Sequence, residues 1–303
     1  MSSRNYVVTV ATHTQGYLPS LQWCLNKTQG RRPQFIVLGR GQKWSNYFDK
    51  IRLLYEFLSS NNLGDNDVVI FCDAYDVIYD HRRDFDRLVE IFRRSQLDLL
   101  FSIVDISRQN KMIQKCAHKI LACLDITNNT LTCNGGLYMG TRRALRAFMY
   151  QIYHNKSEQV DDERCINQLL NESMVSSWLS GSEFPSFDIM LGLAPYRVGL
   201  DVNSRLFYNS PVKLNPLNLV RSASAECNAI ESRDAYFYHF IGNQNLDDLC
   251  AYEGIWRPEC VGNCEIYGKM DKISHYLTFF NTELATLAIV FGLAATLLVS
   301  LRA

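Results

Sequence analysis

Two aspartates with two residues between them are the first candidates for chemistry in this sequence. Asp73 and Asp76 follow the apolar run DVVIFC (67–72) and enclose Tyr75. Carboxylates held this close on a tight turn repel each other, and a divalent cation removes the repulsion while leaving coordination positions open for phosphate oxygens. A simpler interpretation is a buried strand that ends at a turn, with the aspartates capping the next element.

Three further stretches carry polar groups at element ends. A glycine pair precedes a strand-like run in LTCNGGLYMG (131–140), paired acids open the helical stretch VDDERCINQLLNE (160–172), and AYFYHFIGNQ (235–244) is an aromatic strand that ends at His239. Each has a structural alternative. Acids are common in the first turn of a helix, and a histidine in an aromatic strand is by default a core residue with a satisfied hydrogen bond.

Strand-like and helical stretches alternate along the chain. Strands are expected at 5–12, 34–39, 67–73 and 97–104, helices at 46–61, 84–96 and 142–154, and a strand with a turn at 196–209. This alternation predicts an α/β fold, a mostly parallel sheet flanked by helices. Ligands of such sheets bind beyond the carboxyl ends of the strands, where Asp73 and Asp76 fall. Without a linker to divide it, residues 1–282 are expected to form one domain.

Charge and cysteine content exclude some classes of partner. The 303 residues include 31 basic and 31 acidic side chains, so the chain has no general electrostatic attraction to nucleic acid. Only Cys250, Cys260 and Cys264 of the ten cysteines cluster, and a zinc site would need a fourth ligand that is not evident. Most cysteines are expected to be buried thiols, with a disulfide as the alternative in a lumenal domain.

The last stretch of the sequence predicts a membrane anchor. Residues 284–301 (LATLAIVFGLAATLLVSL) are 18 uncharged residues, ten of them Leu, Ile, Val or Phe. As a helix they would span about 27 Å, close to the roughly 30 Å hydrocarbon core of a bilayer. We therefore expect a C-terminal transmembrane helix within residues 283–303 and a single-pass membrane protein. The alternative is a buried terminal helix, and the side of the membrane on which the domain lies stays open.

Nine stretches in a fixed order resemble a known family. They are VVTVATHTQGY, VLGRGQKW, DKIRLLYEFL, DVVIFCDAYDVIY, LLFS, CNGGLYMGT, DDERCINQLL, VGLDVNSRLFYN and YHFIGN. In this succession, and in the closing GIWRPECVGNCE, the chain resembles the glycosyltransferase domain of procollagen lysyl hydroxylases over residues 5–265. The resemblance implies a GT-A type fold. It does not extend to the oxygenase part of those proteins, so lysyl hydroxylation is not predicted.

The resemblance also implies roles for individual residues. A cation, Mn²⁺ or Mg²⁺, would be held by Asp73, Asp76 and His239, and the imidazole favours Mn²⁺. The nucleotide sugar would contact the following residues: Tyr75 stacked on uracil, Thr12 through its main chain, Trp44 and Lys50 closing over the donor, Asn134, Gly135 and Gly136 lining the sugar pocket, and Asn243. Asp161 and Asp162 would reach the sugar or the acceptor, with Asp162 able to take the acceptor proton.

The implied activity is transfer of glucose or galactose from a UDP-sugar to a hydroxyl. In the family the acceptor is collagen hydroxylysine or its galactosylated form, and a protein or another glycan is the alternative here. Two other functions stay open. One is a transferase of the same fold that uses a different nucleotide sugar, and the other is a membrane-anchored scaffold that kept the fold and lost turnover.

Overall fold

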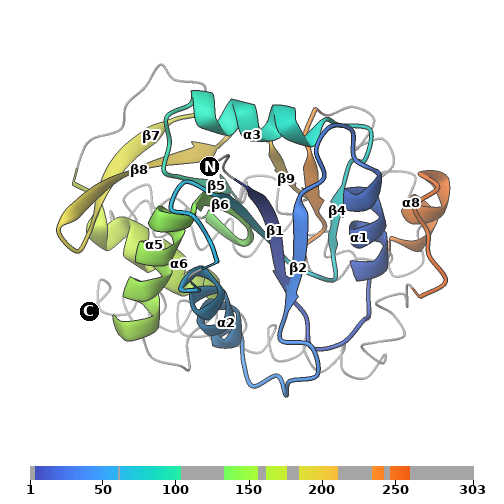
Figure 1. Ribbon diagram of the computed structural model, residues 1–303, viewed down its shortest axis with the longest axis horizontal. Coiled ribbons are helices and arrows are strands. Elements are labelled where there is room, and N and C mark those ends of the chain that lie inside the picture. Colours follow the sequence, from blue (N-terminus) through green and yellow to red (C-terminus); the bar gives the residue numbers. More distant parts are fainter. Residues whose placement is uncertain are drawn as a thin grey trace, which may run out of the picture.

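Two β-sheets organise the part of the chain that the computed structural model describes. The described residues are 4–60, 62–103, 133–155, 162–175, 184–210, 234–241 and 246–259. Within them, a seven-stranded sheet has the order β2-β1-β3-β6-β5-β8-β7 and a three-stranded sheet has the order β4-β10-β9. Helices pack around the large sheet, which gives the predicted α/β fold (Figure 1).

The seven-stranded sheet is mostly parallel, as the alternation of elements predicts. Its strands are β1 (Asn5–Val10), β2 (Gln34–Leu38), β3 (Val68–Cys72), β5 (Leu99–Ile103), β6 (Cys133–Thr141), β7 (Ser186–Leu191) and β8 (Ala194–Asp201). Five of the seven run in one direction, because β6 is antiparallel to both β3 and β5, and β7 is antiparallel to β8. The sequence pattern did not predict that β6, which carries the glycine pair, runs against both neighbours.

The three-stranded sheet is built from very short strands. These are β4 (Val77–Tyr79), β9 (Phe207–Asn209) and β10 (Phe237–His239), with β10 antiparallel to β4 and parallel to β9. Residues 73–76 connect β3 directly to β4, so the chain leaves the large sheet at Asp73 and enters the small sheet after Asp76. Asp73 therefore follows the last strand residue of one sheet, and Asp76 precedes the first strand residue of the other.

Six helices complete the described residues. They are α1 (Leu18–Lys27), α2 (Phe48–Leu58), α3 (Phe85–Arg94), α5 (Arg142–Asn155), α6 (Asp162–Ser173) and α8 (Asp247–Tyr252). Figure 1 shows α2, α5 and α6 grouped together and α1 apart from them beside β4. Helix α3 begins where Asp84 accepts a 2.9 Å hydrogen bond from the backbone N–H of Asp86, a standard N-cap. Helices α1 and α8 were not predicted.

The core lies on both faces of the large sheet because successive strand residues point to opposite sides. In β1, Val7 faces the cluster that holds α1, α3 and the small sheet, while Tyr6 and Val8 face the cluster that holds α2, α5 and α6. All nine residues of β6 except Thr141 are buried, as expected for a strand paired on both edges. The small sheet thus rests on one face of the large sheet through a shared apolar core.

The predicted membrane anchor, residues 283–303, and the predicted domain boundary after residue 282 lie outside the described residues. In the described ranges, none of the helices is both long enough and apolar enough to cross a bilayer.

Candidate active site

One pocket, with a volume of about 610 Å³, gathers the predicted site residues at the carboxyl ends of β1 and β3. Eleven predicted residues line it: Thr12, Trp44, Lys50, Asp73, Tyr75, Asp76, Asn134, Gly135, Gly136, Asp162 and His239. The other lining residues are Val10, Gln15, Tyr47, Ala74, Glu163 and Ile241. The two remaining predictions, Asp161 and Asn243, lie outside the described residues.

The turn that carries the aspartates is fixed at both ends by backbone hydrogen bonds. The N–H of Asp73 donates to the carbonyl of Gly136 at 2.8 Å, which extends the pairing of β3 with β6 by one residue. The carbonyl of Asp76 accepts from the N–H of Phe240 at 2.8 Å, just after β10. The two acids are thus attached to different sheets, and the short turn between them keeps the carboxylates close. Neither aspartate caps a helix, because β4 follows at once.

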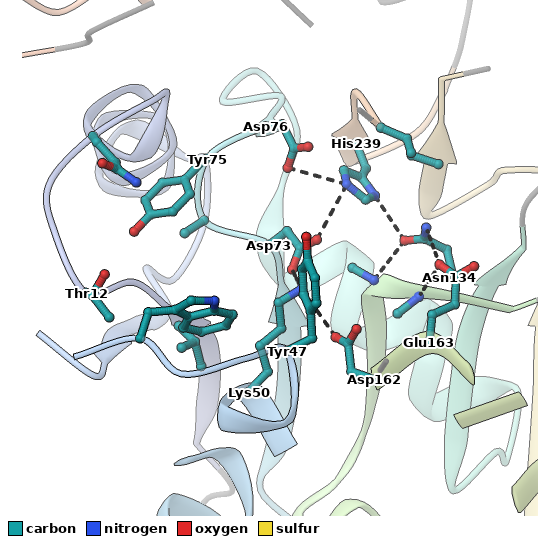
Figure 2. Close-up of a pocket in the computed structure, with 17 residues that line it drawn as sticks. Thr12, Tyr47, Lys50, Asp73, Tyr75, Asp76, Asn134, Asp162, Glu163 and His239 are labelled. Atoms are coloured by element: carbon teal, nitrogen blue, oxygen red, sulfur yellow. Dashed lines mark hydrogen bonds and ion pairs between the residues drawn. The ribbon is translucent and has the colours of Figure 1, made fainter. Parts of the chain in front are cut away.

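His239 completes a group of three potential cation ligands. Its Nε2 lies 3.4 Å from Asp76 Oδ1 and 3.7 Å from Asp73 Oδ2 (Figure 2), and ligand atoms of all three residues lie within 4.8 Å of one another. Burial alone would lower the pKa of His239, but Asp76 and Asp73 outweigh it and raise that pKa above its usual value. Burial also disfavours the Asp73 carboxylate, yet Lys50 and His239 hold the pKa of Asp73 below its usual value.

The donor set of these three residues fits a divalent cation. Two carboxylates and an imidazole suit Mn²⁺. Mg²⁺ also suits the carboxylates, but it prefers oxygen ligands to an imidazole. Atoms bound to one such ion at about 2.0–2.2 Å lie at most about 4.4 Å apart, so the side chains need only small movements to meet it. The backbone also leaves room. A Cβ at Gly136 would stand 2.5 Å from His239 Cε1 and 2.7 Å from Asp73 Oδ2, so only glycine fits beside the ligands.

Lys50 joins the cation ligands to the acids of α6. Its Nζ lies 2.7 Å from Asp73 Oδ1 and 3.2 Å from Asp162 Oδ2. Burial works against the ammonium, but the two carboxylates outweigh it and raise the pKa of Lys50. Lys50 is therefore charged, and it sits in the first turn of α2 with its stem directed into the pocket (Figure 2).

The part of the pocket that lies away from His239 is formed by an aromatic ring and main-chain atoms. Tyr75 and Thr12 lie together there, away from His239 (Figure 2). The hydroxyl of Tyr75 reaches the carbonyl of His13 at 3.4 Å, and its own carbonyl accepts from the N–H of Tyr17 at 3.0 Å. Gly16 (φ +56°) allows this close approach, because a Cβ there would lie 2.8 Å from Tyr75 Cβ. The loop before α1 thus supports the ring of Tyr75.

Two residues that the sequence analysis did not single out stand beside predicted ones. Tyr47 is 52% exposed at the pocket rim, with its ring 6.1 Å from that of Trp44 and 5.5 Å from Lys50 Nζ. Glu163 Oε2 accepts 3.3 Å hydrogen bonds from Asn134 Nδ2 and from the N–H of Gly135. The sequence held a signal for Glu163, since it directly follows the paired acids. Tyr47 had none, because an aromatic at the start of a predicted helix is usually a packing residue.

Comparison with known proteins agrees with the predicted resemblance. The sequence model described as PLOD GT domain, the glycosyltransferase domain of procollagen lysyl hydroxylases, matches residues 2–165, slightly more than half of the chain. No curated protein matches the chain in sequence. The match ends within α6, so it includes Asp73, Asp76 and Lys50 and excludes His239.

Two solved structures are distantly similar. One is the galactosyltransferase LgtC in complex with donor and acceptor sugar analogues, at 15% identity and a TM-score of 0.38, covering 78% of this chain and 87% of that one. The other is A197 from STIV, at 14% identity and a TM-score of 0.33, covering 55% of this chain and 76% of that one. Similarity at this level carries no conclusion about substrate or mechanism.

Proposed function

Since the chain belongs to the PLOD GT domain family and is a glycosyltransferase, we propose that it moves glucose or galactose from a UDP-sugar to a hydroxyl acceptor with the help of a divalent cation, preferably Mn²⁺. One observation carries the proposal. Asp73, Asp76 and His239 present their ligand atoms within 4.8 Å of one another in a pocket large enough for a nucleotide sugar.

The cation, when bound, would supply positive charge to balance the charge that builds on the departing UDP. Lys50 adds a second positive charge from the protein itself. Its ammonium lies between Asp73 and Asp162, so it would be within reach of the diphosphate of a UDP-sugar bound beside these two acids. Electrostatic stabilisation of the leaving group is therefore the main contribution that we assign to this chain.

The rest of the pocket divides into a base side and a sugar side. We assign Tyr75, which the loop before α1 supports, to stacking on uracil, and the main chain at Thr12 to the same region of the pocket. Asn134 and the Gly135–Gly136 pair lie at the opposite end, beside Asp162 and Glu163. We assign that end to the hexose and the acceptor hydroxyl, with Asp162, 3.2 Å from Lys50 Nζ, as the carboxylate that could take the acceptor proton.

The acceptor is proposed from the family alone. Hydroxylysine or galactosyl-hydroxylysine of a collagen-like protein is the first choice, and a hydroxyl of another glycan is the second. A scaffold without turnover is disfavoured because all three ligand types and the charged lysine are retained in contact. A decayed site would have lost at least one of them.

Release of UDP from nucleotide sugars tests the proposal. The full-length protein is incubated with Mn²⁺ and, in separate reactions, with UDP-glucose, UDP-galactose and other nucleotide sugars. We expect Mn²⁺-dependent UDP release with one of the two named donors. Asp73→Ala and Asp76→Ala should each lower the rate by at least about 10³-fold, since each removes a cation ligand.

The matched control for these variants is Asp234→Ala. Asp234 is exposed and pairs with Arg83 outside the pocket, so the rate should stay within about twofold of wild type. All three variants should keep thermal midpoints close to that of wild type. Full activity in either pocket variant would defeat the cation assignment, and UDP release from none of the donors would favour the scaffold.

Membrane attachment through residues 284–301 remains part of the proposal. Its support is the uncharged 18-residue stretch, worth several kcal/mol of insertion free energy on the translocon scale. The full-length protein should stay with the membrane fraction after alkaline carbonate extraction, whereas a variant lacking residues 283–303 should be released. Equal release of both proteins would refute the anchor.

A further inference from the structure

The imidazole of His239 has two different surroundings. Its Nε2 faces Asp73 and Asp76, whereas its Nδ1 faces two side-chain amides. The Nδ1 atom lies 3.0 Å from Asn134 Oδ1 and 3.1 Å from Asn209 Oδ1. Asn209 does not line the pocket and is absent from the predicted site residues.

The orientation of both amides follows from their other hydrogen bonds. Asn134 Oδ1 accepts from the N–H of Gly136 at 2.8 Å, and its Nδ2 donates to Glu163. Asn209 Nδ2 donates to the carbonyl of Ile103 at 2.8 Å, so its oxygen must be the atom that faces His239. Both atoms around Nδ1 are thus amide oxygens, which can only accept.

A ring nitrogen that faces acceptors carries a hydrogen, and in the metal-free ring this holds for Nε2, which faces the carboxylates, as well as for Nδ1. We propose that Asn209, together with Asn134, keeps the hydrogen on Nδ1 of His239, so that Nε2 is the nitrogen left to bind a cation at the two aspartates. Asn209 is in this sense a positioning residue for the cation site. The role in cation binding rests on the proposed function, whereas the hydrogen on Nδ1 rests only on the hydrogen bonds around the ring.

Strand register explains why Asn209 can do this. In the parallel pair of β9 and β10, Asn209 lies opposite His239, so the two side chains are neighbours on one face of the small sheet. The amide of Asn209 then reaches Ile103 at the end of β5 in the large sheet. Asn209 therefore connects the ligand histidine to both sheets, and its own position is fixed by backbone on each side.

Loss of this acceptor has a definite consequence. Outer hydrogen bonds to a metal-binding histidine set its tautomer and ring orientation, and their removal typically weakens metal binding 10- to 100-fold. Asn134 cannot isolate the effect, because it also lines the proposed sugar pocket. Asn209 can, because its contacts are with His239 and the carbonyl of Ile103.

The test compares three variants of the full-length protein. Asn209→Leu removes the acceptor and keeps the volume, and Asn209→Ala serves in its place if the leucine variant does not fold. Asn209→Asp restores an acceptor. Asn171→Leu is the control, since Asn171 is exposed on α6, its amide donates to the carbonyl of Asn167, and it does not line the pocket.

Two measurements are made on each protein. Binding of Mn²⁺ alone is measured by the electron paramagnetic resonance signal of free Mn²⁺. The hydrogen on Nδ1 of His239 is followed by NMR in the ¹⁵N-histidine-labelled, metal-free protein, as the rate at which it exchanges with water, with His239→Gln for assignment. The second measurement does not depend on activity or on a bound metal.

We expect a slowly exchanging Nδ1 hydrogen in wild type and in Asn171→Leu. Asn209→Leu should show faster exchange of that hydrogen and 10- to 100-fold weaker Mn²⁺ binding, and Asn209→Asp should restore both within a few fold. No hydrogen on Nδ1 in wild type, or unchanged exchange and affinity in Asn209→Leu, would overturn the inference. If wild type binds no Mn²⁺ but shows a slowly exchanging Nδ1 hydrogen that Asn209→Leu loses, the assignment of the Nδ1 hydrogen stands and the cation of the proposed function fails.

Discussion

The two sheets contribute to the pocket in different ways. The large sheet supplies Asp73, Asn134 and Gly136, all within the stretch that matches the family. The small sheet supplies Asp76 at the start of β4, and His239 with Asn209 from strands that follow the matched stretch by more than 40 residues. The family signature therefore covers one side of the cation site, while the remaining ligand comes from a later part of the chain.

The sheets also differ in how they are held. The large sheet has strands of five to nine residues and cores on both faces. The small sheet has strands of three residues, too short to be stable alone, and depends on packing against the large sheet. The position of His239 relative to Asp73 therefore depends on how well the small sheet packs against the large sheet. The following predictions are ordered from the largest expected effect to the smallest.

A methyl group at Gly136 should have the largest effect, because it would stand where the sheets meet. In Gly136→Ala, the new Cβ would lie 2.5 Å from His239 and 2.7 Å from Asp73, so the ligands must separate. Displacement of reacting groups by about 1 Å can cost 10²-fold in rate. We expect Mn²⁺-dependent UDP release and Mn²⁺ affinity each to fall by at least about 10²-fold.

Gly64→Ala is the control for that variant. A Cβ at Gly64 would meet Asp67 at an ordinary 3.4 Å, and Gly64 precedes β3 whereas Asp73 follows it. It should bind Mn²⁺ as wild type does. Wild-type affinity for Mn²⁺ in Gly136→Ala would mean that the two sheets can move apart at no cost. That result would contradict the inference that packing of the small sheet sets the distance between His239 and Asp73.

Core substitutions on the two sides of the molecule should separate stability from cation binding. Phe237 is fully buried in the small sheet against Tyr79, and Phe148 is fully buried in α5 against Phe101. Phe237→Leu and Phe148→Leu should each lower the free energy of unfolding by about 1–3 kcal/mol. Only Phe237→Leu should also weaken Mn²⁺ binding, because it lies two residues from His239 on the same strand.

Urea unfolding and Mn²⁺ titration of both variants check this. Equal loss of Mn²⁺ affinity in the two would indicate that binding follows global stability rather than docking of the small sheet. Unchanged affinity in both would show that the small sheet holds His239 without help from its own core.

The smallest effect concerns pH in the metal-free protein. The raised pKa of His239 means that its contacts with Asp76 and Asp73 stabilise the fold fully below the usual histidine pKa of about 6.5, and that this contribution is lost as pH rises through the raised pKa. The lowered pKa of Asp73 makes its contribution present above about pH 4 and lost as pH falls through the lowered pKa. Both contributions are therefore present between about pH 4 and 6.5.

Urea unfolding with a chelator measures this effect as the difference in unfolding free energy between wild type and His239→Gln. The difference should be larger at about pH 5.5 than at about pH 9. A difference that is constant, or that grows with pH, would show that the acids do not raise the pKa of His239.

Much of the large sheet could be predicted from the sequence because its signals are local. An apolar run of strand length followed by DAYD gives both β3 and the turn, and the predicted helices at 46–61 and 84–96 correspond to α2 and α3. Helix α1 was missed although Pro19 in its first turn was a usable signal. The short strand β4 could not be predicted, because three residues carry no periodicity.

The second half of the pocket was harder because its contacts are nonlocal. His239 was placed at the cation only through the resemblance, and nothing in its aromatic strand distinguishes it from a core histidine. The contact of Lys50 with Asp162 joins residues 112 positions apart. Asn209 could not have been predicted at all, since its role depends on the register between β9 and β10.

The four residues from Asp73 to Asp76 are a short connection between the large sheet and the small sheet. A cation bound by an aspartate at each end of this connection, and by His239 of β10 as well, would cross-link the two sheets. Saturation with the ion should then slow amide hydrogen exchange in β4, β9 and β10 far more than in β1 or β3. The cation would then contribute to the packing of the small sheet against the large one as well as to the reaction.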